Sequence, residues 1–154
     1  MAGENVKYLL DTHAIFWLVI DSPKLGKRAK RSMQRAGEGA IAIADITLFE
    51  LAQLDRRGTI ALAPTAAAFL ADVSARCVVL PVVAEIAADA AFVALPQGDP
   101  FDRLIVATAR HHELVLPRMA TSRTREWWRR YGERWRKIGH WSTLVTWTSS
   151  SHSL

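Results

Sequence analysis

The sequence predicts an α/β fold, a three-layer α/β/α sandwich around a central parallel sheet. Short apolar runs at residues 6–10, 40–44, 78–80 and 114–116 are typical of buried strands, and helical segments separate them. Parallel strands require such crossover connections. The chain has 154 residues, 50% of them hydrophobic. A domain of this size buries about 70% of the surface of its unfolded chain, so it needs no disulfides to fold.

Helices are predicted where apolar residues recur at spacings of three and four. Residues 23–36 form one such segment, which ends at Gly37, a residue typical of helix ends. Its other face is strongly basic, and that face is either simply exposed to solvent or in contact with a nucleic acid. The remaining helices are predicted over residues 15–19, 46–57, 65–75, 82–93 and 99–112.

The charge of the chain is unevenly distributed. The net charge is +5, but residues 1–116 carry −1 and residues 117–154 carry +6, together with five of the six tryptophans. A basic protein suggests a nucleic-acid partner, although here the excess charge lies mostly in the last quarter. The one cysteine excludes a disulfide framework and a Cys-rich zinc site. Because neither a signal peptide nor a membrane span is recognisable, we expect a cytoplasmic protein.

Four acidic residues stand out by their context. Asp11 directly follows the first apolar strand, Glu50 interrupts an apolar helical stretch, and Asp99 and Asp102 flank a Pro-Phe pair at a helix start. In parallel sheets, ligands bind at the carboxyl ends of the strands, which is where Asp11 falls. Carboxylates gathered there repel one another, and a divalent cation relieves that repulsion. Oxygen ligands suit Mg²⁺ or Mn²⁺, and such a centre supports attack of activated water on phosphorus.

Each of these acids also has a purely structural interpretation. Asp11 can cap the helix that follows it. Asp99 is expected chiefly as a helix N-cap, with Pro100 at the first helical position and Asp102 where the helix dipole favours an acid. Glu50 can be an exposed residue of an amphipathic helix. The residues alone leave these alternatives open.

Three segments of the chain resemble the PIN-domain family and, within it, the VapC toxins of bacterial toxin–antitoxin systems. They are YLLDTH at residues 8–13, ITLFELA at 46–52 and GDPFDRLIVATA at 98–109. Their order and spacing fit the family, and the resemblance covers about residues 6–116. It implies an α/β sandwich and a Mg²⁺- or Mn²⁺-dependent endoribonuclease that cuts cellular RNA.

The resemblance also implies roles for individual residues. Asp11, Glu50 and Asp102 would bind the metal, and Asp99 would assist catalysis. Thr47 and Thr12 are further candidates beside the metal, with Thr47 placed to order a metal-bound water. The candidate RNA contacts are Lys27, Arg28 and Arg31 on the basic helix, together with Arg103. The expected partners are a cognate VapB-like antitoxin, the RNA substrate and a second copy of the chain in a homodimer.

The sequence departs from the family after residue 116. PIN domains usually carry a fourth acid just after the fourth strand, but here no Asp or Glu occurs between Glu113 and Glu126. We therefore expect two regions, a PIN-like domain over residues 1–116 and a divergent basic, Trp- and Arg-rich tail over 117–154. If the codon of Arg118 ends in G, residues 119–122 read one nucleotide earlier begin with Asp-Gly, so a shifted reading frame is one hypothesis. The alternatives are a basic extension that binds single-stranded RNA and a disordered tail.

The missing acid leaves a second function open. The chain could be a catalytically impaired PIN-fold protein that binds its antitoxin or RNA without efficient cleavage. A phosphatase with Asp11 as nucleophile is disfavoured, because the residue two positions later is His13 rather than a second Asp.

Overall fold

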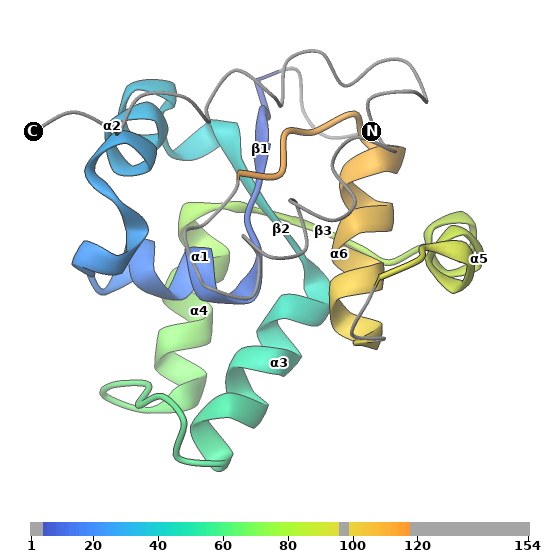
Figure 1. Ribbon diagram of the computed structural model, residues 1–154. Helices are drawn as coiled ribbons and strands as arrows, with labels where there is room; N and C mark the ends of the chain where they lie inside the picture. The colour runs from blue at the N-terminus through green and yellow to red at the C-terminus, as the bar shows by residue number, and fades with distance from the viewer. Residues whose placement is uncertain (1–4, 96–98, 118–154) are drawn as a thin grey trace, which may run out of the picture. The chain divides into compact units, whose positions relative to one another are not determined.

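The computed structural model describes residues 5–95 and 99–117. Three parallel strands form one sheet in the order β1-β2-β3: β1 (Tyr8–Leu9), β2 (Ile41–Ala44) and β3 (Val78–Leu80). All four residues of β2 are buried, as expected for a central strand that is covered on both faces. In Figure 1 the sheet lies between α5 and α6 to one side and α1, α2 and α4 to the other. The predicted α/β fold with a parallel sheet is confirmed.

The prediction of a fourth strand at residues 114–116 is wrong in extent. Val115 forms only an isolated parallel bridge to Tyr8, at the edge of β1 that β2 leaves open. The Leu9 amide donates to the Val115 carbonyl and the Val115 amide donates to the Lys7 carbonyl, both at 2.9 Å. Glu113, two residues before Val115, has a positive φ of 54°, so this segment directly follows a tight turn. β1 is therefore bonded on both edges despite its short length.

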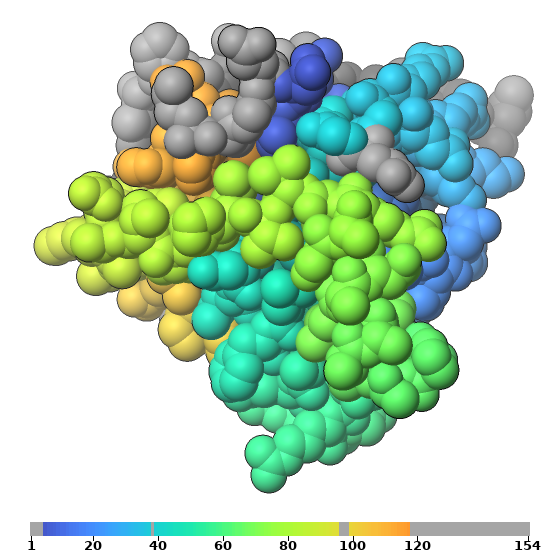
Figure 2. Space-filling view, turned by 180° about the vertical axis from the view of Figure 1, so that it is seen from behind, coloured from blue at the N-terminus to red at the C-terminus, as the bar shows by residue number. Residues whose placement is uncertain are grey.

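In the part of the chain that the structure describes, six α-helices connect and cover the strands, and their positions agree with the predicted segments within a few residues. They are α1 (Thr12–Val19), α2 (Lys27–Ala36), α3 (Asp45–Arg56), α4 (Ala66–Arg76), α5 (Ala84–Phe92) and α6 (Pro100–His111). From the opposite side, residues 66–95 form the surface across the middle of the described domain, with α5 at its margin (Figure 2). None of these described helices is both long enough and apolar enough to cross a membrane.

The segment predicted as one helix over residues 23–36 is divided in two. A 3₁₀ turn, η1 (Pro23–Leu25), ends at Gly26, and α2 begins only at Lys27. Gly26 has a φ of +77°, which interrupts the helical hydrogen bonds and which residues with a side chain rarely adopt. The predicted end is confirmed, because Gly37 has a φ of +82° and its amide bonds to the Met33 carbonyl.

The core fixes α6 against the sheet. One buried cluster joins the strands to α6, and it contains Leu9, Ala42, Ala44, Leu80, Ile105, Ala109 and Leu114. A second cluster joins α5 to α6, and it contains Ile86, Ala90, Val93 and Ala107. Each large apolar side chain buried in this way contributes about 1.5–3 kcal/mol. The two clusters hold α6 from both sides, so the acids at its first turn have a defined position.

Candidate functional site

Asp11 lies at the carboxyl end of β1 and begins α1. It is the N-cap of that helix, and its Oδ1 accepts a hydrogen bond from the Ala14 amide at 2.7 Å. The capping interpretation is therefore confirmed. Burial raises the pKa of Asp11, while the Ala14 amide and the charge of His13 act in the opposite direction. A carboxylate that is costly to ionise thus stands at the sheet edge where ligands bind in this class of fold.

Glu50 reaches the same place from α3. The Thr12 hydroxyl, which is only 2% exposed, donates a hydrogen bond to Oε2 of Glu50. Burial raises the pKa of Glu50, the Thr12 bond lowers it, and the negative charges of Asp99 and Asp11 raise it again. Glu50 is half-buried, so it is not the solvent-facing residue that an amphipathic helix alone would allow.

Asp99 and Asp102 complete the group at the start of α6. Asp99 is the N-cap, and its Oδ1 accepts from the Phe101 amide at 2.9 Å, which confirms its predicted capping role. Asp102 lies in the first turn. Although its side chain is exposed at the surface, neighbouring atoms partly desolvate its carboxylate. Together with the charges of Asp99, Glu50 and Asp11, this raises the pKa of Asp102 to about 6. We call these four residues the acidic cluster.

The acidic cluster fits a hard divalent cation in its chemistry. Its donors are all carboxylate oxygens, and the ionised forms repel one another in a partly desolvated place. Among residues 5–95 and 99–117, no three acids lie at the spacing of shared metal ligands. The side chains would therefore have to converge around a bound ion by changing rotamers.

Thr47, the residue predicted to order a metal-bound water, has an unpartnered hydroxyl among the described residues. It lies one helical turn before Glu50 and is fully buried, and its hydroxyl has no hydrogen-bond partner in the part of the chain that the structure describes. Buried hydroxyls without a partner are uncommon, because each costs about 1–3 kcal/mol. A water molecule at the cluster would satisfy it. The Nε atom of Arg103, next to Asp102, is likewise buried without a partner among the described residues.

The predicted RNA contacts on α2 are not part of this site. Lys27, Arg28 and Arg31 are exposed, and Ala29 and Met33 on the opposite face are buried. Figure 1 shows α2 apart from α3 and from the start of α6. The basic face is thus a separate surface.

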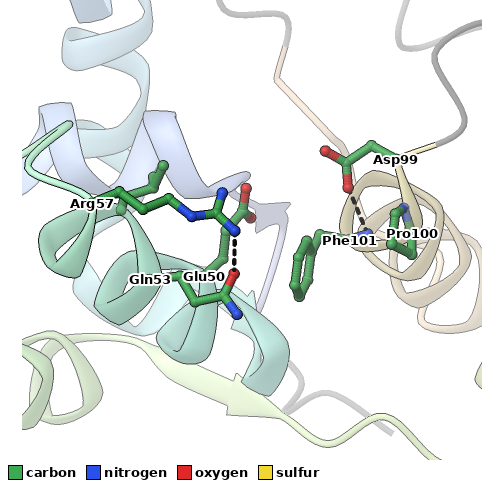
Figure 3. Close-up of a pocket in the computed structure, with 7 residues that line it drawn as sticks. Glu50, Gln53, Arg57, Asp99, Pro100 and Phe101 are labelled. Carbon is green, nitrogen blue, oxygen red and sulfur yellow. Dashed lines mark hydrogen bonds between the residues drawn. The ribbon is translucent and has the colours of Figure 1, made fainter.

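A pocket of about 350 Å³ opens beside the acidic cluster, and it was not predicted from the sequence. Its lining residues come from α3 and from the start of α6: Glu50, Gln53, Leu54, Arg57, Asp99, Pro100 and Phe101. Figure 3 shows Arg57, Gln53 and Glu50 facing Phe101, Pro100 and Asp99 across it. The available signal was the spacing of Gln53, Leu54 and Arg57 at three, four and seven residues after Glu50, which places them on one helix face.

Comparisons with known proteins agree with this geometry. The model of the PIN domain family matches residues 8–116. The chain belongs to the PIN-domain family. It is 36% identical over 107 residues to Ribonuclease VapC22 of Mycobacterium tuberculosis, a match that covers 68% of this chain and 79% of that protein.

Two solved structures share the fold. One is a toxin–antitoxin complex from Klebsiella pneumoniae, with a TM-score of 0.53 and 22% identity over 76% of this chain and 89% of the other. The second is PAE2754 from Pyrobaculum aerophilum, with a TM-score of 0.54 and 21% identity over 79% of this chain and 84% of the other. At these identities the likeness concerns the fold alone.

Proposed function

We propose that this chain is a VapC-type toxin ribonuclease of a toxin–antitoxin system, which hydrolyses phosphodiester bonds of cellular RNA with Mg²⁺ or Mn²⁺. The observation that carries the proposal is the acidic cluster, held by β1, α3 and α6 at one sheet edge of a PIN-domain chain. The relative named Ribonuclease VapC22 supports the activity. The likeness to a toxin–antitoxin complex supports the antitoxin as partner.

Each residue of the site has a defined task in this reaction. Asp11, Glu50 and Asp102 would hold the cation, which when bound activates water and neutralises charge on the phosphate. Thr12 orients Glu50 through its hydroxyl. Thr47 offers its unpartnered hydroxyl to a water beside Glu50. Asp99 adds negative charge to the site while it caps α6.

Binding of the RNA backbone falls to basic residues outside the acidic cluster. Lys27, Arg28 and Arg31 form an exposed basic face on α2, and Arg103 follows Asp102. Contacts between such residues and phosphates weaken steeply as salt concentration rises. An affinity that falls with salt, and falls less steeply in a Lys27→Gln, Arg31→Gln variant, is the expected signature.

The direct test is cleavage of total cellular RNA by the purified chain in Mg²⁺, Mn²⁺ or EDTA. Wild type and the Asp102→Asn variant are compared, with Asp72→Asn as the matched control, because Asp72 lies on α4 and pairs with Arg76 at the surface. We expect cleavage that needs the metal, disappears in Asp102→Asn and persists in Asp72→Asn. Cleavage that survives both EDTA and the Asp102 substitution would rule out this site as its origin.

A second function stays open because of one observation. No acid lies between Glu113 and Glu126, where the family usually has its fourth. A chain that lacks this ligand could bind RNA or antitoxin without cutting efficiently, and it would then bind Mn²⁺ in calorimetry yet leave RNA intact.

The reading-frame hypothesis is tested by sequencing the coding DNA, since an Arg118 codon that does not end in G excludes it. Apart from Pro117, the tail at 117–154 lies outside the described residues.

The remaining partners and the location follow from the same proposal. We place the protein in the cytoplasm, where RNA is present, with an antitoxin that covers the acidic cluster until it is released. Light scattering on the purified chain tests the predicted homodimer, which would have twice the 17.1 kDa mass of one copy.

A further inference from the structure

We propose that the pocket between α3 and α6 receives one unpaired nucleobase of the RNA, next to the phosphodiester that the acidic cluster attacks. The inference rests on the proposed ribonuclease function and adds the residues that would hold a base beside the cleaved bond. Glu50 and Asp99 belong both to the pocket wall and to the acidic cluster. A base bound in this pocket would therefore belong to a nucleotide of the RNA strand next to the phosphate at the cluster.

The size and charge of the pocket favour a base over a phosphate. At about 350 Å³ it lies near the lower end of the volumes of small-ligand sites, about 300–1,000 Å³, so it admits a single nucleoside and excludes a base-paired duplex. Two carboxylates and one guanidinium, that of Arg57, line it, and the excess of negative charge disfavours an anionic phosphate. A neutral base carries no such cost.

One aromatic ring in the pocket wall and a second ring packed against it supply a surface for stacking. The ring of Phe101 lines the pocket, and the ring of Phe49 lies 6.2 Å from it between centroids, at an interplanar angle of 48°. Phe49 is 54% exposed, so its ring is accessible to a base from solvent. Unpaired bases stack on such rings in RNA-binding proteins, and duplexes do not.

Polar groups on the opposite wall can read the edge of the base. Nη2 of Arg57 donates to Oε1 of Gln53 at 3.3 Å, so the two polar side chains lie together on the α3 wall of the pocket. Figure 3 shows these two side chains opposite Phe101. Donors from Arg and Gln, with Asp99 and Glu50 as acceptors, can pair with both the carbonyl and the amino groups of a base.

The test measures binding rather than cleavage, in EDTA, so that it does not depend on catalysis. The probes are a fluorescent single-stranded RNA of mixed sequence, a hairpin duplex of the same length and an abasic oligomer of the same charge. We expect Phe49→Ala to weaken binding of the single strand by about 5- to 100-fold, the range for loss of one stacked base, and to leave the abasic oligomer unchanged. Phe49→Trp should restore the affinity.

The chain offers a matched control in Phe92, which is 87% exposed on α5 and lies outside the pocket. Phe92→Ala should bind all three probes as wild type does. Phe101→Leu keeps an apolar side chain in the pocket wall but removes the ring, so it should reproduce the loss seen in Phe49→Ala. The inference is overturned if both Phe49 and Phe101 variants bind the single strand as wild type does, or if they lose equal affinity for all probes. It is also overturned if they lose only the antitoxin, since the pocket would then be a protein contact.

The inference and the proposed function can fail separately. A wild-type chain that cuts RNA in Mn²⁺ but shows no dependence on Phe49 keeps the nuclease and loses the base pocket. A chain that binds the single strand through Phe49 but cuts nothing in Mg²⁺ or Mn²⁺ keeps the pocket and loses the nuclease.

Discussion

Asp11 has a structural and a proposed chemical role, and one substitution separates them. Asparagine caps helices as well as aspartate does, so Asp11→Asn keeps the bond to the Ala14 amide but removes the charge. Its free energy of unfolding should equal or exceed that of wild type, because burial disfavours the ionised carboxylate. Calorimetric titration with Mn²⁺ should show weaker binding.

Asp11→Ala is the contrasting variant. It removes the cap as well, and it should cost about 0.5–2 kcal/mol of stability in addition to the loss of Mn²⁺ binding. If Asp11→Asn binds Mn²⁺ with unchanged affinity, Asp11 is a cap and not a ligand.

Substitutions at Thr12 test whether its hydrogen bond holds the Glu50 carboxylate in place. Thr12→Val has the same shape but leaves the Glu50 carboxylate without its hydroxyl donor, which lowers the pKa of Glu50 as the charge of His13 also does. Hydrogen bonds to charged groups contribute about 1.5–3 kcal/mol, and urea denaturation should show a loss of this size. Thr12→Ser keeps the hydroxyl and should lose far less. Equal losses in the two variants would mean that packing, and not the hydrogen bond, is what Thr12 provides.

At the scale of residues, the acids of the site could be predicted from the sequence, whereas the pocket was not. Asp11, Asp99 and Asp102 were recognisable because each follows a strand or begins a helix, and those signals are local. The pairing of Phe49 with Phe101 joins residues 52 positions apart, and no local pattern encodes it. The Thr12–Glu50 bond is hidden for the same reason.

Gly26 decides where α2 begins, and its substitution tests that element. Alanine at a φ of +77° is strained, at a cost of about 1–3 kcal/mol, and urea denaturation should show a loss within that range. Gly39→Ala is the control, since an added Cβ there meets no atom within 4 Å and its φ is not in the left-handed region. A Gly26→Ala variant as stable as wild type would show that the break between η1 and α2 is not imposed by this residue.

At the scale of elements, periodicity predicted the helices and missed their exact starts. Leu25, Ala29 and Met33 share a spacing of four, and all three are buried, so the apolar pattern continues across a break in the backbone. The pattern reports which side chains meet the core, whereas Gly26 sets the backbone angle. The apolar run at 114–116 is similar, because apolar character shows burial but does not show how many neighbours a strand will find.

The acidic cluster makes the stability of the whole domain depend on pH. An acid whose pKa is raised by folding stabilises the fold while protonated, and that contribution is lost as the pH rises through its folded pKa. For Asp102 the loss occurs between its ordinary value of 3.8 and about 6. Asp11 and Glu50 act in the same direction. The melting temperature of the metal-free protein should therefore fall as the pH rises through this range.

The variant that isolates this effect is Asp102→Asn, whose melting temperature should fall less over the same range. Burial lowers the pKa of His112, which acts in the opposite direction, so the difference between wild type and variant is the quantity to compare. Mn²⁺ added at neutral pH should raise the melting temperature of wild type more than that of Asp102→Asn. Parallel curves for the two proteins would contradict a coupled acidic cluster.

The two-sided pairing of β1 has a consequence for how the protein is made. β1 leaves the ribosome first, but its two neighbours in the sheet are β2 and Val115, and the latter is among the last residues of the described domain to be synthesised. The acids at positions 11, 50, 99 and 102 are equally dispersed along the chain, and contacts this distant form late because the intervening loops must first close. No partly synthesised chain can assemble the site, so translation of this domain is nearly complete before the ribosome and its RNAs meet the proposed nuclease.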